Sequence, residues 1–226
     1  MTTRTLKKLH ATAVAAFLLT LFASTGAAQA AYGQDECDVD ENTIRMNFSL
    51  YYEDFKNESY ETALPYLGWI LKCAPGFPGN NDRNFRRAVE SYAGMSSKME
   101  DPEMKRVYLD SALHVFDIAV PTLQEAGVEV DEFEWIFREG RFIQSHNSVL
   151  QDLQGQVSDL YMQAWEMNPE EMQPYYINFI IADLVNRDMK GDAVDFIDRV
   201  EETYPDNDEV LGLVEQWRGQ LFTSPE

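Results

Sequence analysis

The sequence has few of the residues and motifs that enzymes use for chemistry. It contains two cysteines and three histidines in 226 residues. It lacks the G-x-S-x-G, H-E-x-x-H and glycine-rich phosphate-loop motifs, which position a nucleophile, a metal ion and a phosphate group respectively. His10 lies in the apolar N-terminal segment, and His114 and His146 show no ligand spacing with the cysteines. We therefore expect a non-enzymatic protein with neither a cofactor nor a metal site.

Basic residues are scarce as well: 18 Lys+Arg stand against 39 Asp+Glu, a formal net charge of −21. Such a surface repels nucleic acid and anionic membranes, so we expect no nucleic-acid partner. The alternative to a solvated acidic surface is a cation site, and the segment DVDENTIRMNFS spaces Asp38, Asp40 and Asn42 like calcium-loop ligands. That pattern fails, because Thr43 replaces the required glycine and Ser49 replaces the closing glutamate.

Long hydrophobic runs are absent after the N-terminal segment, so no membrane span is expected in the mature chain. The N-terminal segment combines Arg4, Lys7 and Lys8 with the apolar run ATAVAAFLLTLFAS and an A-x-A sequence ending at Ala30. This arrangement is typical of a cleaved secretory signal, and a membrane anchor would need about 20 apolar residues. Cleavage would leave 15 basic and 39 acidic residues, a formal charge of −24. We expect residues 1–30 to be a signal peptide and the mature chain to be periplasmic or secreted.

The two cysteines, Cys37 and Cys73, are candidates for a disulfide bond. Cys37 precedes the first predicted helix and Cys73 ends the second, and antiparallel packing would bring both positions to the same end of the pair. In an oxidising compartment such a pair favours a disulfide bond. The alternatives are unpaired thiols or a redox or metal pair, although neither cysteine lies in a C-x-x-C motif.

A pattern of small and apolar residues recurs four times. It has the A-x₃-F…P spacing, in which a small residue lets two helices approach and a later proline ends the second helix. The positions are Ala63, Leu67 and Ile70; Ala112, Phe116 and Ala119; Val157, Tyr161 and Ala164; and Ala193, Ile197 and Val200, followed by Pro75, Pro121, Pro169 and Pro205. The repeats are 49, 45 and 36 residues apart, where a regular array has about 34, and the extra length falls in predicted loops such as APGFPGNNDRN and SSKMEDPEMK.

The helices that precede these segments are less regular. FRRAVESY and YYINFIIADLVN follow the first-helix spacing, NFSLYYEDFKNESYETAL fits a first helix and turn without a gap, and DEFEWIFREGRFIQSHN is amphipathic but irregular. The final segment, NDEVLGLVEQWRGQLF, has one apolar face, which suits a capping helix. Six large aromatic residues are expected in the packed core: Tyr66, Trp69, Tyr108, Phe116, Tyr161 and Trp165.

On these residues the chain resembles the tetratricopeptide-repeat superfamily from about residue 42 to residue 222. It looks most similar to exported members from Gram-negative bacteria, which have long, irregular helical pairs. The resemblance implies an all-α fold, a right-handed α-solenoid of about four helical pairs with a C-terminal capping helix. The expected organisation is a signal peptide (1–30), an acidic lead-in (31–41), the helical-repeat domain (42–222) and a tail (223–226).

The resemblance also implies that the inner faces of the first helices bind another polypeptide. The candidate residues are Arg45, Phe48, Tyr52, Phe55 and Lys56 in the first unit, Arg83 and Arg86 in the second, and Tyr175, Asn178 and Asn186 in the last. Arginine pairs with a carboxylate through two parallel hydrogen bonds, so the cluster of Arg83, Arg86 and Arg87 suits a carboxylate-bearing peptide. The alternative is that these arginines only pair with the surrounding acids.

We therefore expect an adaptor or scaffold of the cell envelope that binds a protein or peptide partner. A self-associating structural subunit that uses the terminal helix is the first alternative. An accessory to an envelope enzyme is the second, and no residue favours it. Charge reversal at Arg83 and Arg86 would abolish partner capture by an adaptor, whereas truncation before Asn207 would change the oligomer mass of a self-associating subunit.

Overall fold

The structure, a computed structural model, describes residues 37–223. The chain divides into two units at Val39, and every described helix belongs to the second unit, Asp40–Glu226. The predicted signal peptide and most of the predicted acidic lead-in lie outside the described residues, as do residues 224–226 of the predicted tail.

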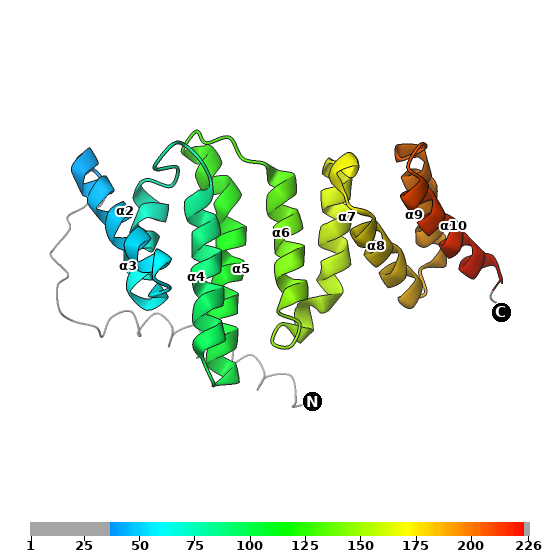
Figure 1. Cartoon of the computed structure of the whole chain (residues 1–226), viewed down its shortest axis with the longest axis horizontal. Coiled ribbons are helices and arrows are strands. Elements are labelled where there is room, and N and C mark those ends of the chain that lie inside the picture. Colours follow the sequence, from blue (N-terminus) through cyan, green and yellow to red (C-terminus); the bar gives the residue numbers. More distant parts are fainter. Residues whose placement is uncertain (1–36, 224–226) are drawn as a thin grey trace, which may run out of the picture. The chain divides into compact units, whose positions relative to one another are not determined.

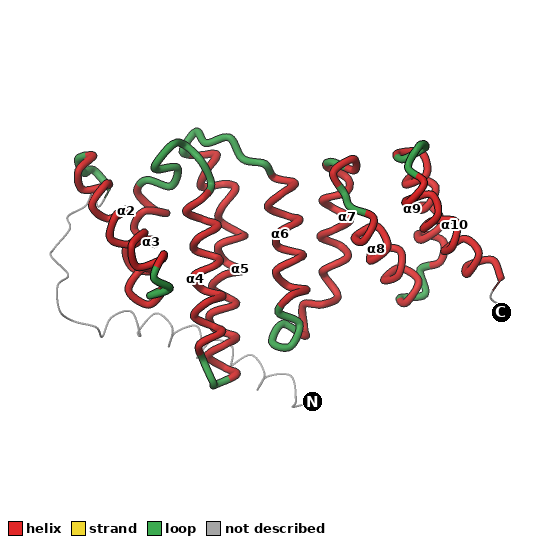
Figure 2. Tube along the Cα trace, in the orientation of Figure 1, coloured by secondary structure: helices red, strands yellow, loops and turns green. Residues whose placement is uncertain are grey.

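The described residues form nine α-helices and two short 3₁₀ helices, without a strand (Figure 1, Figure 2). The α-helices are α2 (Glu41–Lys56), α3 (Tyr60–Cys73), α4 (Arg83–Lys98), α5 (Pro102–Glu125), α6 (Glu132–Ser145), α7 (Val157–Met167), α8 (Pro174–Asn186), α9 (Lys190–Thr203) and α10 (Asp208–Thr223). The 3₁₀ helices η1 (Gln151–Gln156) and η2 (Pro169–Glu171) flank α7. The predicted all-α fold class is therefore confirmed for this part of the chain.

Aspartates begin three of these helices. The side chains of Asp40, Asp101 and Asp131 accept hydrogen bonds of 2.8, 2.9 and 3.2 Å from backbone N–H groups in the first turns of α2, α5 and α6. Each bond satisfies a donor that has no partner within the helix. Pro102 follows Asp101 at the start of α5, where its missing N–H costs nothing.

Helices that are neighbours in the chain supply most of the packing. Contacts join each helix from α2 to α10 to the next one, and α10 also contacts α8. Figure 1 shows this succession within the second unit, from blue α2 to red α10.

The repeat pattern identifies the side chains that pack between the helices. All twelve small and apolar positions of the pattern are buried, with exposed fractions of 8% or less. Gly140 adds a close approach of α6 to α7, because a Cβ atom at this position would lie 2.8 Å from Cε1 of Tyr161. The predicted spacing of the second helices therefore marks the core correctly.

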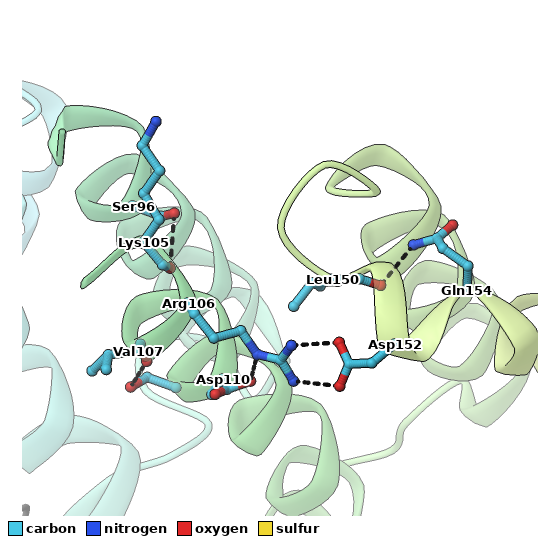
Figure 3. Close-up of polar contacts among 9 residues, drawn as sticks. Ser96, Lys105, Arg106, Val107, Asp110, Leu150, Asp152 and Gln154 are labelled. Atoms are coloured by element: carbon cyan, nitrogen blue, oxygen red, sulfur yellow. Dashed lines mark hydrogen bonds and ion pairs between the residues drawn. The ribbon is translucent and has the colours of Figure 1, made fainter. Parts of the chain in front are cut away.

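A cluster of ion pairs joins α5 to η1 (Figure 3). Arg106 donates hydrogen bonds from Nη1 and Nη2 to the two carboxylate oxygens of Asp152, the second over 3.1 Å, and from Nε to Asp110 over 2.7 Å. The hydrogen bond to Asp152 is the main cause of a raised pKa for Arg106. This contact connects residues 46 positions apart in the chain.

Three expectations about the scaffold are wrong. Pro121 does not end its helix, because α5 continues to Glu125. The predicted loop SSKMEDPEMK is mostly helical, and only residues 99–101 separate α4 from α5. Among the six aromatic residues expected in the core, Tyr66 is 39% exposed, Trp69 and Tyr108 are half-buried, and the other three are buried.

Candidate functional site

The arginines that lack a carboxylate partner define the candidate site. Seven of the ten arginines in the described part of the chain lie within ion-pair distance of an Asp or Glu side chain: Arg45, Arg86, Arg106, Arg138, Arg187, Arg199 and Arg218. The other three are Arg83, Arg87 and Arg141. In a chain with twice as many acids as bases, a guanidinium without an acidic neighbour is unusual.

The structure separates the two arginines that the sequence paired as candidates. Arg86 donates a hydrogen bond of 2.7 Å to Asp82, the residue directly before α4, so its charge is already compensated. Arg83 is exposed and has no carboxylate partner among the described residues. Of these two candidates, Arg83 is therefore the one whose guanidinium is open to a ligand.

Arg87, which the sequence places in one cluster with Arg83 and Arg86, makes contacts that the sequence did not indicate. Its Nη1 donates a hydrogen bond of 2.9 Å to the hydroxyl oxygen of Tyr51. Its Cζ atom lies 4.6 Å from the ring centroid of Tyr52 and 5.8 Å from that of Phe55. The guanidinium of α4 is thus held against aromatic rings of α2 by hydrogen bonding and cation–π attraction, without a carboxylate.

A buried hydrogen-bond network fixes this arginine. Tyr51 and Asn84 are both buried, and the Tyr51 hydroxyl donates to Oδ1 of Asn84. The amide nitrogen of Asn84 donates to the carbonyl oxygen of Phe77 and, over 3.4 Å, to that of Pro75. Burial raises the pKa of Tyr51, while the hydrogen bond from Arg87 acts in the opposite direction. The Tyr51 hydroxyl therefore remains neutral and orients Arg87 at ordinary pH.

The beginning of α4 carries positive charge where a helix usually carries acids. Its first turn contains no acidic residue, and Arg83, Arg86 and Arg87 all lie within its first five residues. The helix macrodipole is also positive at this end, so it repels these three arginines. The dipole and the arginines together attract an anion. Local rules are typically broken in this way at functional sites.

The other candidate residues of α2 differ in whether they contact Arg87 or pair with an acidic side chain. Tyr52 and Phe55 contribute the rings beside Arg87, and Phe48 stacks on Tyr52 at 5.5 Å. Lys56 pairs with Glu53 over 2.7 Å, and its Nζ lies 5.1 Å from the Tyr52 ring. Arg45 pairs with Glu41 over 2.6 Å. The structure therefore brings Tyr52, Phe55 and Lys56 to Arg87, and leaves Arg45 in an ion pair of its own helix.

The candidates of the last unit do not join this cluster in any contact of the described residues. Asn178 accepts a hydrogen bond of 2.8 Å from Nε1 of Trp217, so its amide oxygen serves the packing of α10 on α8. Asn186 is exposed at the end of α8. Tyr175 is 59% exposed, and its hydroxyl accepts a hydrogen bond of 3.3 Å from Gln144.

Both cysteines, Cys37 and Cys73, are disulfide-bonded, and the part of the chain that the structure describes holds no free thiol. The predicted disulfide is therefore confirmed. None of the helices in residues 37–223 combines the length and the apolar character that crossing a membrane requires. Within the same residues, no group of three or more His, Cys, Asp or Glu side chains is arranged to hold a metal ion.

Comparison with known proteins assigns no family. No protein-family model matches the chain, and neither a curated protein nor a solved structure is significantly similar to it. The fold and the site therefore show only that residues 37–223 are all-helical, carry a disulfide bond and hold Arg87 against aromatic rings between α2 and α4 without an acidic partner.

Proposed function

We propose that this protein is an exported, non-enzymatic adaptor that binds a carboxylate-bearing segment of a protein or peptide partner in the cell envelope. Its described helices would form a tetratricopeptide-like α-solenoid with α10 as the cap. Packing between successive helices and the burial of all twelve repeat positions support this architecture. The signal-like N-terminal segment and the disulfide bond support export.

The proposal rests mainly on the environment of the Arg87 guanidinium. A buried tyrosine and a buried asparagine hold its guanidinium beside the rings of Tyr52 and Phe55, and no carboxylate compensates its charge. Arg83, which is also uncompensated, precedes it by one helical turn on the same face. Two arginines in this position would bind a carboxylate by charge-assisted hydrogen bonds, and the rings would contact an adjacent apolar side chain.

The net charge of the chain sets a condition on this binding. A chain of formal charge −21 repels an acidic partner at long range, whereas the guanidiniums act at contact distance. Added salt screens the long-range repulsion over about 8–10 Å near physiological ionic strength. We therefore expect association with an acidic peptide to become faster, not slower, when salt is raised from very low concentration.

The test compares two double variants in pull-downs from envelope extract, quantified by mass spectrometry. Arg83→Gln/Arg87→Gln removes the two uncompensated charges, and Arg187→Gln/Arg199→Gln removes the same charge from arginines that already have acidic partners. Circular dichroism and thermal melting confirm that both variants fold. We expect the first variant alone to lose partners that the unchanged protein retains, and equal recovery by both variants would overturn the site.

A self-associating structural subunit is the second candidate function, and one observation favours it. Phe222, near the end of α10, is 70% exposed, the largest exposed fraction among the large hydrophobic side chains described. Truncation before α10 would also remove the buried Val210 and Val214 and so expose the core against which they pack, so a single Phe222→Ser substitution is the cleaner perturbation. A concentration-dependent oligomer in analytical ultracentrifugation that this substitution dissociates would support self-association.

A further inference from the structure

The third uncompensated arginine, Arg141, lies away from the cluster of α2 and α4. It is exposed on α6 and has no carboxylate partner among the residues that the structure describes. Its Cζ atom lies 5.9 Å from the ring centroid of Phe137, one turn earlier in the helix. Gln144 follows one turn later, so Phe137, Arg141 and Gln144 lie on one face of α6.

An exposed tyrosine of α8 is fixed beside this face by a relay of hydrogen bonds. The hydroxyl of the buried Tyr161 donates to Oε1 of Gln144 over 2.7 Å, and Nε2 of Gln144 donates to the hydroxyl oxygen of Tyr175 over 3.3 Å. Tyr175 nevertheless remains 59% exposed. A large apolar ring that is both exposed and held in place is suited to contact a partner, because little side-chain entropy is lost on binding.

A packed aromatic cluster supports these surface groups. The rings of Phe137 and Tyr176 lie 4.6 Å apart, and those of Tyr161 and Tyr176 lie 4.9 Å apart. Tyr175 contacts the same cluster through Tyr176, at 5.0 Å between ring centroids. Burial raises the pKa of Tyr161 and the nearby Arg141 acts in the opposite direction, which places the guanidinium charge close to the relay.

We propose that Arg141, Gln144 and Tyr175 form a second binding site, for an acidic peptide segment in which a carboxylate stands next to an aromatic or apolar side chain. Arg141 would bind the carboxylate through charge-assisted hydrogen bonds. The exposed face of Tyr175 would contact the adjacent apolar side chain. The site consists of α6 and α8 residues only, so it exists independently of the cluster between α2 and α4.

The positive charge of Arg141 indicates that the second site binds an acidic peptide segment. Of the ten arginines in residues 37–223, Arg141 is one of three that lie beside no acidic side chain, whereas the other seven pair with one. The unpaired guanidinium of Arg141 lies on the same face of α6 as Gln144, which holds the exposed Tyr175 by a hydrogen bond. This arrangement matches a carboxylate next to an apolar group, and a basic partner would be repelled from the guanidinium.

The experiment measures fluorescence anisotropy of a fluorescein-labelled peptide of alternating glutamate and phenylalanine, with a glutamine-for-glutamate peptide as the neutral control. The variants are Arg141→Gln and Tyr175→Ala, and Arg199→Gln is the matched control at an arginine that pairs with Glu166 over 2.6 Å. All are made in the unchanged mature chain and in the Arg83→Gln/Arg87→Gln background. Arg141 and Tyr175 are exposed, and because the Tyr175 ring contacts Tyr176, circular dichroism and thermal melting check that each variant folds.

We expect Arg141→Gln to weaken binding of the acidic peptide by about tenfold in both backgrounds, because one charge-assisted contact is lost. Tyr175→Ala should weaken it severalfold, and Arg199→Gln should have no effect. Equal affinities for Arg141→Gln and Arg199→Gln would overturn the second site, as would equal binding of the acidic and neutral peptides. If the Arg83→Gln/Arg87→Gln background removes all binding, the second site is refuted while the proposed function stands.

Discussion

Replacing Glu139 by glutamine should stabilise the folded protein at alkaline pH. Glu139 lies on α6 between Trp135 and Phe142, one turn away in each direction, and both of these rings are buried against Phe116 of α5. Its carboxyl group accepts no hydrogen bond from a described residue, and burial, followed by repulsion from Asp117, raises its pKa from 4.5 to about 7. The charged form is therefore the disfavoured one in the folded state.

The sign of the pH dependence follows from this raised pKa. The folded state holds the Glu139 proton more tightly than the unfolded state, so the stabilisation is complete below about pH 4.5 and is lost as the pH rises through about 7. The full difference between a pKa of 4.5 and a pKa of about 7 would change the free energy of unfolding by about 3 kcal/mol. Because the side chain is only half-buried, solvent screening should reduce the effect to about 1–2 kcal/mol.

The assay is thermal or urea unfolding of the unchanged protein and of Glu139→Gln between pH 4.5 and 8.5. Glutamine is neutral throughout, so the variant should match the unchanged protein near pH 4.5 and exceed it at pH 8, by about 3–6 °C in Tm for a domain of this size. Glu215→Gln, at an exposed position of α10, is the control and should show no such divergence. Parallel curves for Glu139→Gln across the whole range would refute the reasoning.

Three further predictions concern the scaffold. Arg106→Gln should lower the free energy of unfolding by about 1 kcal/mol in urea titrations, because the exposed bridge from α5 to Asp152 is lost; no change would mean that the bridge is energetically neutral. Gly140→Ala should cost about 1–3 kcal/mol, since the new methyl group would overlap the Tyr161 ring, and an unchanged Tm would show that the ring can move aside. Reduction of the disulfide bond should cost about 3–4 kcal/mol, and a Cys37→Ser/Cys73→Ser variant that is insensitive to reductant should reproduce the loss.

Much of the core was predictable because burial in helical pairs follows local spacing. The positions of Ala63, Leu67 and Ile70 recur at a helical period, and a helix that packs on both neighbours must bury that stripe. The prediction that Tyr66 is buried was wrong because Tyr66 lies at the edge of this stripe, where an aromatic ring can turn toward solvent. The prediction that Pro121 ends its helix was also wrong. A proline inside a long helix removes one backbone hydrogen bond, and the packing of α5 on α4 and α6 can offset that loss.

The importance of Arg87 could not be predicted from local spacing alone. Its position depends on Tyr51, 36 residues earlier, and on Asn84, whose amide is fixed by carbonyl groups of the loop between α3 and α4. These contacts arise only when α2 and α4 are brought together by tertiary packing. A sequence pattern can place both side chains on helices, but it cannot state that their polar atoms meet.

One signal in the sequence does distinguish the uncompensated arginines from most of the others. Residues four apart on a helix are neighbours, and five arginines have an acid at that spacing and pair with it: Arg45 with Glu41, Arg86 with Asp82, Arg106 with Asp110, Arg138 with Glu134 and Arg187 with Asp183. Arg83, Arg87 and Arg141 have no acid four residues away in either direction. Arg218 shares that lack but reaches Glu201 of α9 over 2.9 Å. Arg199 has Asp195 at this spacing, although it pairs with Glu166 of α7. Among the ten arginines of residues 37–223, the absence of an acid at this spacing therefore selects four, and only the tertiary contact with Glu201 distinguishes Arg218 from the other three.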